Sequence, residues 1–534
     1  MRKFYILFLV FTFAKSIKSA AQVIPDSLRV NWSQAGYAGV IPNPSTIINV
    51  KDFGAYGNGI NDDYDAILKA INSSKLPRVI YFPTGNYLIK SAIVPPDNVI
   101  FRGDGTSTNL SFDLSASSKK DAFTISGKHT AAFTGIKSGY TKNSTSLMLD
   151  STTGFTAGSY AEIKETNGSW NKVPADWATD CVGQIVKVVA VNGNQVTIDP
   201  ALRITYQSNL SPQIRPVTLK SNVGFECLKI TRIDNIIDSK YGNNISFTYA
   251  ANCWVIGVES NKSQGAHILL TSSKNILVSG CYFHEAFTYD GTGTSGYGIL
   301  MIQHNSDSKV ENCIFKHLRH AMILKQGANG NIFAYNYSFD PYRSEIPHDA
   351  GGDMVLHGHY AFANLFEGNL GLSIVIDNTY GPSGPYNTFF RNRTDLYGIS
   401  IQSQSVQSNY QNIVGNEVTN KDAFKGNYTL SGKQFAYGNN IKGKIQPTNT
   451  SALNDVSYHL IFKPYFWGTT KWPSVGTPNT ISSGTIPAKD RYSTGNYIYC
   501  QKPPAQQTVI IAANEKDNND NYENAKNKVI ISSK

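Results

Sequence analysis

The feature that most constrains this chain is a motif that recurs every 23 or 24 residues through its middle. Each copy is a short run of β-branched or aromatic residues ending in Gly or Asn. The copies end at Gly257, Gly280, Asn312, Asn336, Asn369, Asn392, Asn416 and Asn439. Two of the steps, 32 and 33 residues, are about nine residues longer than the others. A strand-like unit this short buries its inner face only by stacking on copies of itself.

The repeat predicts an all-β fold, a right-handed parallel β-helix in which each copy is one coil of a solenoid. Gly and Asn tolerate the left-handed backbone conformation, so their recurrence indicates a sharp turn stacked coil upon coil. A leucine-rich repeat has a similar period, but its Leu-x-x-Leu-x-Leu signature is absent. The 44 Gly, 30 Tyr and 26 Phe also favour a turn-rich β protein. With 41% apolar, 12% aromatic and only 16% charged residues, the composition excludes a disordered chain or a nucleic-acid-binding tail.

The first 21 residues are predicted to be an export signal and not part of the fold. Arg2 and Lys3 precede an apolar run over residues 4–14, and Ser19-Ala20-Ala21 supplies the small residues that a signal peptidase accepts. We therefore expect a secreted or periplasmic protein that begins at Gln22. The run is shorter than the ~20 residues that span a bilayer, and no comparable run follows, so no membrane insertion is expected.

Charge and cysteine content restrict the partners and cofactors. Removing residues 1–21 takes away four basic residues and no acidic one, so the formal charge of +10 becomes +6. This excess permits an anionic partner, and no nucleic-acid partner is expected. None of the six cysteines lies in a CxxC pair, which favours small core residues over a disulfide framework or a metal cluster. They are Cys181, Cys227, Cys253, Cys281, Cys313 and Cys500.

The rhythm of the repeat divides the mature chain into five segments. We expect an N-terminal cap with the first coils over 22–136, a small β insertion over 137–206, the main coils over 207–445, a C-terminal cap over 446–505 and a flexible tail over 506–534. Within the insertion, strands are predicted at 146–149, 160–163, 184–191 and 195–198, with Asn192-Gly193 as a hairpin turn. The insertion either shapes a cleft over the coils or only supports their packing.

The start of the repeat region carries a resemblance to a known family. The segment 50–59 (VKDFGAYGNG), followed by Asn61-Asp62-Asp63 and a helix-like stretch over 64–71, resembles the opening of the pectate-lyase-like, glycoside hydrolase family 28-related β-helix proteins. Segments 79–87 and 100–105 continue the resemblance. It implies a β-helix start and cap, so catalysis is not placed on Asp62 or Asp63. Such relatives include hydrolases, lyases and phage-type binding proteins, so the resemblance indicates fold and not reaction.

Four successive strands of the repeat region share the pattern apolar, variable, apolar, polar, at 322–325, 354–357, 374–377 and 399–402. If the first and third residues point into the core, the fourth points outward. Neighbouring coils lie about 4.8 Å apart, so the four outward residues form one exposed column. They are Lys325, His357, Asp377 and Gln402. His359 is predicted on the same face, and His304 occupies the equivalent position two coils earlier.

The two longer steps of the repeat place extra loops just before these strands. One loop covers 287–296 and contains Asp290, and the other covers 340–352 and contains Arg343 and Asp349. Two long loops beside a polar column are expected to form the walls of a groove for an extended polysaccharide. Arg319 and His320, immediately before the Lys325 strand, complete the predicted substrate-binding residues.

We predict that Lys325, His357 and Asp377 are catalytic. β-Elimination needs a base that removes the proton beside a uronate carboxylate and a cation that stabilises the resulting enolate. His357, held between an acidic and a basic side chain, is suited to proton transfer near neutral pH. Together with Lys325 and Arg319 it favours a lyase that acts on an anionic, uronate-containing polysaccharide.

Alternatives stay open at this point. A glycoside hydrolase needs two carboxylates, which would be Asp377 and a loop residue, Asp290 or Asp349. A third reading is a non-catalytic glycan-binding β-helix in which the column is only a solvated face. His357 and His359 offer two nitrogens to a metal, but no third ligand is fixed by spacing, so no metal is assigned. No cofactor is assigned; calcium stays a candidate, since a calcium ion can bridge carboxylates in similar lyases, but no aspartate cluster specifies it here. We expect a monomer.

Overall fold

The computed structural model describes residues 22–73, 76–117, 121–129, 131–234, 242–291, 293–504, 509–511 and 529–531. The predicted export signal and residues 514–528 of the predicted flexible tail lie outside the described residues. Short strands β40 (Val509–Ile511) and β41 (Val529–Ile531) pair with each other. Within the described part of the chain, none of the helices has the length and apolar character needed to cross a bilayer.

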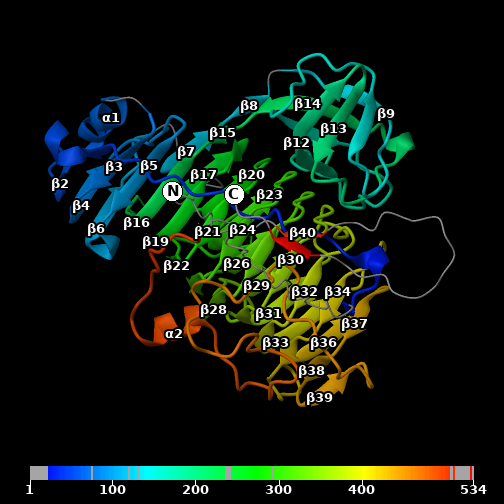
Figure 1. Cartoon of the computed structure of the whole chain (residues 1–534). Coiled ribbons are helices and arrows are strands. Elements are labelled where there is room, and N and C mark those ends of the chain that lie inside the picture. The colour runs from blue at the N-terminus through cyan, green and yellow to red at the C-terminus, as the bar shows by residue number, and fades with distance from the viewer. Residues whose placement is uncertain are drawn as a thin grey trace, which may run out of the picture.

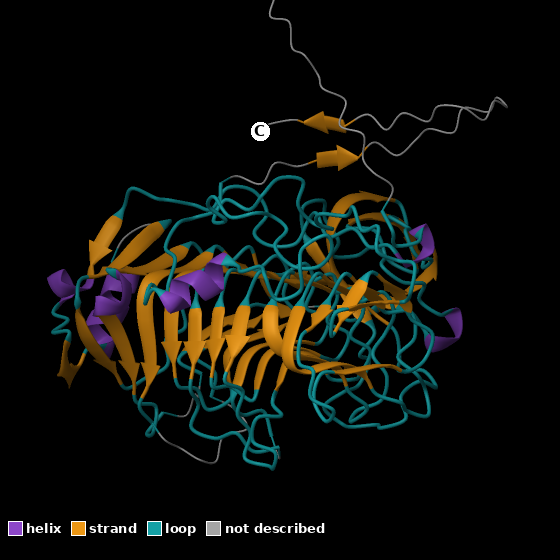
Figure 2. Ribbon diagram, turned by 90° about the horizontal axis from the view of Figure 1, so that it is seen from below, coloured by secondary structure: helices purple, strands orange, loops and turns teal. Residues whose placement is uncertain are grey.

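Thirty strands wind as a right-handed parallel β-helix, which confirms the predicted fold (Figure 1). Strands of successive coils lie side by side in a long row (Figure 2). The parallel pairings arrange them in three columns. The first, which we call the site sheet, contains β7 (Phe123–Ser126), β17 (Ile245–Thr248), β20 (Ala266–Thr271), β23 (Tyr297–Ile302), β26 (His320–Leu324), β29 (Gly352–Leu356), β31 (Leu370–Ile376), β33 (Arg393–Ile401) and β36 (Asn427–Leu430).

The other two columns complete each coil. The second contains β1 (Ile47–Asn49), β3 (Arg78–Phe82), β5 (Val99–Gly103), β16 (Val223–Arg232), β19 (Trp254–Asn261), β21 (Leu277–Ser279), β24 (Lys309–Glu311), β27 (Ile332–Ala334), β30 (Leu365–Glu367), β32 (Thr388–Phe390), β34 (Asn412–Val414) and β37 (Phe435–Tyr437). The third contains β2 (Asn58–Asp62), β4 (Gly85–Ile89), β6 (Thr108–Phe112), β22 (Tyr282–His284), β25 (Ile314–Lys316), β28 (Tyr337–Phe339), β35 (Glu417–Val418), β38 (Asn439–Ile441) and the antiparallel β39 (Lys444–Gln446).

One continuous apolar core fills the coils. Aromatic rings from successive coils stack in it: Phe333, Phe366 and Phe389 lie 5.2 and 4.8 Å apart in nearly parallel planes. Helix α1 (Tyr64–Asn72) buries Ile67 and Ile71 against this core at the N-terminal end. It coincides with the helix-like stretch predicted at 64–71. The described residues also form the short 3-10 turns η1 (Asp26–Leu28), η2 (Val50–Phe53), η3 (Gly105–Ser107) and η4 (Ser208–Leu210).

The Gly and Asn residues that end the repeat motif, here called the repeat anchors, occupy two neighbouring positions of the turn, one in some coils and the other in the rest. Gly257, Gly280 and Asn312 adopt positive φ, as the sequence predicts. From the next coil on, the residue with positive φ precedes the anchor asparagine, beginning with Tyr335 at φ 58° and Gly368 at φ 65°. The anchor asparagines instead form a buried ladder in which each Nδ2 donates to the Oδ1 of the asparagine in the next coil at 2.9–3.0 Å. The ladder residues are Asn336, Asn369, Asn392, Asn416 and Asn439.

The insertion is a seven-stranded sheet that lies over later coils (Figure 1). Its strands are β8 (Lys128–His129), β9 (Thr134–Ser138), β10 (Ser146–Leu149), β11 (Tyr160–Lys164), β12 (Gly183–Asn192), β13 (Gln195–Asp199) and β14 (Gln213–Thr218). The sheet is therefore wider than the range 137–206 expected from the sequence. Arg203 is ion-paired with buried Asp307, and Asn329 Nδ2 donates to Gly183 O at 2.9 Å. These contacts fasten the insertion to the turns that follow the site sheet.

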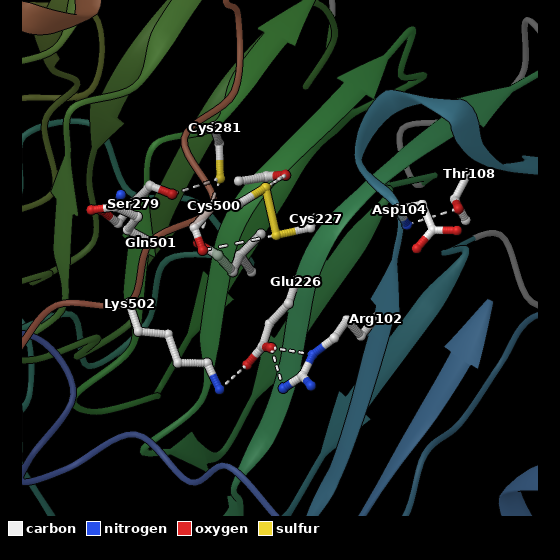
Figure 3. Close-up of a disulfide and its surroundings, with 12 residues drawn as sticks. Arg102, Asp104, Thr108, Glu226, Cys227, Ser279, Cys281, Cys500, Gln501 and Lys502 are labelled. Carbon is white, nitrogen blue, oxygen red and sulfur yellow. Dashed lines mark hydrogen bonds and ion pairs between the residues drawn. A yellow bond between two sulfur atoms is a disulfide. The ribbon is translucent and has the colours of Figure 1, made fainter. Parts of the chain in front are cut away.

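The C-terminal segment, residues 447–504, is largely irregular and runs back along the coils instead of only covering the last one. Trp467 packs on Tyr335 with ring centres 5.0 Å apart, and helix α2 (Pro487–Ser493) brings Arg491 to Asn312. A disulfide then joins Cys500 to Cys227 in an early coil (Figure 3). The prediction of six core cysteines is therefore wrong for this pair, because the returning segment brings together residues 273 apart in the sequence. Cys181, Cys253, Cys281 and Cys313 are free and buried, as predicted.

Candidate functional site

The register of the site sheet places the predicted polar residues in one column. Leu324 pairs with Leu356, Leu356 with Ile376, and Ile376 with Ile401, and all four side chains are buried in the core. The column residues come directly after these core residues, on the outer face. They are Lys325, His357, Asp377 and Gln402. The column is less open than expected, because His357 and Asp377 are each only 9% exposed.

The centre of the column is a hydrogen bond between His357 and Asp377 on neighbouring coils. Asp377 Oδ2 contacts His357 Nδ1, and Asp377 Oδ1 accepts the backbone N–H of Thr379 at 3.1 Å. A carboxylate only accepts hydrogen bonds, so the proton of the neutral imidazole lies on Nδ1. The ring is thereby oriented with Nε2 as its basic nitrogen.

Lys325 lies beside this pair in an environment that disfavours its charge. Its pKa is lowered from 10.5 to about 8, chiefly by burial and secondly by the positive charge of Arg319, while Asp377 acts in the opposite direction. The Nζ atom lies 4.9 Å from the centre of the Trp177 ring, which comes from the insertion. An ammonium group over an indole face is a favourable contact. Lys325 therefore changes charge near pH 8 while remaining an available cation below it.

Arg319 and His320 approach the same centre from the start of β26. Arg319 Nη1 donates to Gly293 O at 3.0 Å, and its guanidinium lies 5.4 Å from the centre of the Tyr297 ring. The ring of His320 lies 6.1 Å from that of His357. Burial, followed by repulsion from Arg319 and His357, holds the pKa of His320 well below its usual value. His320 is thus neutral, and Arg319 adds a second cation near Lys325.

The two remaining predicted histidines behave differently from each other. His304 is buried under the insertion, where Nδ1 bonds Glu162 at 2.9 Å and Nε2 bonds Asp180 O at 2.8 Å. Contrary to the expectation of an exposed groove residue, it fastens the insertion to the coil. His359 lies beside the column and is also buried, and neither of its ring nitrogens has a hydrogen-bond partner among the described residues. Burial lowers the pKa of His359 to about 4.

The two long loops contact each other. Glu345 Oε1 accepts the backbone N–H of Gly291, and the backbone N–H of Ser344 bonds Tyr289 O at 3.2 Å. Asp290 lies at this junction, where its carbonyl accepts from Ser295 Oγ at 2.9 Å. Arg343 folds onto its own loop through a 3.0 Å bond from Nε to Pro347 O. The loops therefore make one joined wall at the starts of β23 and β29.

Asp349 and Gln402 each have hydrogen-bond partners on other coils. Asp349 accepts from Tyr397 Oη at 2.6 Å and pairs with Lys425 at 3.0 Å, and the first of these bonds is the main cause of its lowered pKa. Gln402 Oε1 accepts the backbone N–H of Asn378 at 3.1 Å. The described contacts thus hold Asp349 as an ionised carboxylate bound to a lysine, and they do not join it to Asp377.

Sequence reasoning missed two aromatic residues of the site. Tyr380 packs edge-on against His357 at 4.9 Å and stacks on His359 at 5.5 Å. Trp177 meets both His359 and Tyr380 at near-perpendicular angles, 4.9 and 5.1 Å between ring centres. Tyr380 follows Asp377 by three residues, so its proximity to the column could have been predicted from the sequence. Trp177 carried none, since only the tertiary placement of the insertion brings it there.

The site offers no evident metal centre. Across the described ranges, with the gaps given above, no group of three or more His, Cys, Asp and Glu side chains is arranged to hold a metal ion. The arrangement instead combines an oriented imidazole, two cations and an aromatic edge. These groups can remove a proton, stabilise developing negative charge and contact a sugar ring.

Comparison with known proteins gives matches to parts of the chain. Residues 47–173 match the family model described as rhamnogalacturonase A/epimerase, pectate lyase-like. The chain is 36% identical over 91 residues to the non-secreted LysM effector LysM19 of Penicillium expansum, which covers 15% of this chain and 7% of that protein. It is 40% identical over 65 residues to a glucan 1,3-beta-glucosidase of Cochliobolus carbonum, covering 10% and 8% respectively. Each of these matches spans less than a tenth of the relative.

Among solved structures, the tailspike protein gp49 from Pseudomonas phage LKA1 is similar with a TM-score of 0.43 and 16% sequence identity. The alignment covers 73% of this chain and 64% of the tailspike.

Proposed function

We propose that this protein, a pectate-lyase-like parallel β-helix of the carbohydrate-active kind, is a lyase that cleaves an anionic, uronate-containing polysaccharide by β-elimination. The observation that carries the proposal is the bond between Asp377 and His357. In this bond the carboxylate of Asp377 holds the imidazole at Nδ1, so Nε2 of His357 is the nitrogen left to act as the base. A base flanked by cations matches what elimination requires.

In the proposed reaction, His357 Nε2 takes the proton from the carbon beside the uronate carboxylate. The C–H electron pair forms a carbon–carbon double bond, the bond to the glycosidic oxygen on the next carbon breaks, and that oxygen takes a proton from water. Lys325 and Arg319, the two cations of the site, would stabilise the enolate formed as the proton leaves. Asp377 stabilises the imidazolium ion that His357 becomes.

The hydrolase alternative finds less support. It needs Asp377 and a second carboxylate as a free acid–base pair, which leaves Asp290 or Asp349 as the partner. Asp377 contacts His357 and Thr379, and Asp349 is held by Tyr397 and Lys425, so only Asp290 stays open as the second carboxylate. If the protein is a non-catalytic glycan binder, replacing the column residues can affect glycan binding and nothing else.

The test is a screen of the purified protein on uronate-rich and neutral polysaccharides. Elimination creates an unsaturated uronate end that absorbs ultraviolet light, whereas hydrolysis yields only new reducing ends. We expect both signals to rise together on a uronate-rich chain. Reducing ends without the absorbance would indicate a hydrolase instead of a lyase. If no signal appears on any polysaccharide, only the glycan-binding alternative remains.

We also propose that the protein works outside the cytoplasm, as the sequence of its first 21 residues suggests. The disulfide between Cys227 and Cys500 supports this location, because such bonds form and persist in oxidising compartments (Figure 3). Fusion of residues 1–21 to a reporter and fractionation of the cells tests it. Retention of the reporter in the cytoplasm would contradict the proposal.

A further inference from the structure

Trp177 is the most exposed of the six tryptophans, with 48% of its surface accessible. Its backbone is fixed to the coils, since Gln326 Nε2 donates to Trp177 O at 2.7 Å. The side chain of Asn167 braces the same loop by bonding Ala178 O and Cys181 N, each at 2.8 Å. The loop therefore has a defined position, and the indole is presented to solvent at the edge of the site.

The indole is connected to the reacting centre through one ring. Tyr380 packs against Trp177 on one side and against His357 on the other, at 5.1 and 4.9 Å between ring centres. Lys325 Nζ contacts the same indole at 4.9 Å. A sugar unit that lies on Trp177 is therefore a neighbour of the unit that lies between Lys325 and His357.

His359 lies against the indole with two unused hydrogen-bonding atoms. Its Nδ1 and Nε2 are buried and unpartnered within the described part of the chain, and its ring packs edge-on against Trp177 at 4.9 Å. A buried donor and acceptor without partners are unfavourable. A ligand hydroxyl that bonds one of them would remove part of this cost, which gives the ligand-bound state an advantage over the free one.

We propose that Trp177, Tyr380 and His359 form a sugar-binding subsite beside the catalytic pair. The indole stacks on the C–H face of one pyranose ring of the polysaccharide, and a hydroxyl of the same ring bonds the imidazole of His359 as the indole shifts to admit it. Aromatic faces with a few placed polar groups suit a ring that is apolar on its faces and polar at its rim. The inference rests on the proposed polysaccharide substrate and gives the insertion a role in binding it.

The experiment measures binding by calorimetry in the His357→Ala protein, so that no probe is consumed. The probes are oligogalacturonates and oligomannuronates of two to eight units, with neutral glucan oligosaccharides alongside. We expect Trp177→Ala to weaken binding of a recognised probe about tenfold and Trp177→Phe to weaken it less. Tyr56→Ala, which removes a 60% exposed ring from the N-terminal coils, is the matched control and should change nothing.

His359→Phe separates a binding role from a structural one. It keeps a ring in place but removes the two unpartnered nitrogens, so the melting temperature should stay the same or rise while the affinity falls. If the melting temperature and the affinity both fall in His359→Phe, His359 only supports the fold and does not belong to the subsite.

The outcomes separate this inference from the proposed reaction. Unchanged affinity in Trp177→Ala overturns the subsite, even if the wild-type protein produces unsaturated ends. Weakened affinity in Trp177→Ala supports the subsite, and if the wild-type protein releases no such ends the lyase is contradicted while the subsite stands. Failure of every probe to bind would overturn both.

Discussion

Asp377 on one coil holds His357 on the preceding coil through Nδ1, a contact between residues 20 positions apart that the stacking of two strands brings together. His357 Nδ1 is held from the next coil, while Asp377 is also held by Thr379 of its own coil. The proposed base thus depends on the register of β29 and β31, because a shift of one strand by one residue turns its outward side chain into the core and separates the pair.

Replacing Asp377 with Asn should leave the fold intact and lower the turnover number about a hundredfold or more. The amide keeps the size of the side chain but loses the negative charge that stabilises imidazolium and fixes the tautomer. Turnover on the polysaccharide and thermal unfolding of the same preparation check this. Asp150→Asn, which removes a 57% exposed carboxylate of the insertion, is the control, and comparable loss there would indicate a general effect of losing a negative charge.

The rate should fall as the pH rises through about 8, because Lys325 loses its charge there. Below that pH the ammonium ion is present to stabilise the enolate, and above it the amine is neutral. In Lys325→Arg the cation persists, so the alkaline decline should move to higher pH, whereas Lys325→Met should be slow at every pH. Profiles of the turnover number against pH measure this. A rate that rises through pH 8 would make Lys325 the base and contradict its role as a cation.

Glu165 provides a second pH effect, on stability and not on rate. Burial raises its pKa from 4.5 to about 7 in the folded protein. Between these values the unfolded chain has lost the proton while the folded one retains it, so the free energy of unfolding falls as the pH rises from about 4.5 to 7. Glu165→Gln should remove this contribution. Urea unfolding at pH 4.5 and 8 should show the variant gaining stability relative to wild type at the higher pH, and no difference between the two pH values would refute the assignment.

Replacing ladder residue Asn369 with Ala should destabilise the protein by about 2 kcal/mol or more. Asn369 Nδ2 donates to Phe333 O and Asn392 Oδ1, and its Oδ1 accepts from the backbone and side chain of Asn336. Removal leaves buried groups on both neighbouring coils unpaired. Urea unfolding measures the effect, with the exposed Asn378→Ala as control; a loss no greater than that of the control would mean that the ladder adds little.

Reduction of the disulfide between Cys227 and Cys500 should destabilise the protein by ~2–5 kcal/mol, as expected for a bond that closes a long loop. The double variant Cys227→Ser, Cys500→Ser should unfold at the temperature of the reduced wild type and show no response to a reductant. The four buried cysteines should not react with a thiol reagent in the folded state. Equal melting temperatures for oxidised and reduced wild type would show that the C-terminal segment is held by its other contacts.

The sequence predicted the parts of the molecule that follow from local periodicity. Alternation along each strand located Lys325, His357 and Asp377, because the register of a stacked coil is set by its inward apolar residues. The same periodicity could not distinguish the residue with positive φ from the ladder asparagine that follows it, because Asn is favoured at both positions.

The parts that were missed depend on distant segments that fold back onto the coils. His304 occupies the predicted position but is covered by the insertion, and Trp177 reaches the site from the same insertion. The pairing of Cys227 with Cys500 requires the C-terminal segment to return along the solenoid. No spacing within the sequence encodes these approaches.

The insertion leaves the solenoid in an early coil but bonds turns more than 100 residues later, at Asp307 and Asn329. During synthesis or transport, its finished sheet must wait until those turns emerge before it can dock. Contacts between such distant residues slow folding. The proposed active centre combines Trp177 of the insertion with Lys325, His357 and Asp377, so a chain delivered only as far as the insertion has coils but no complete centre.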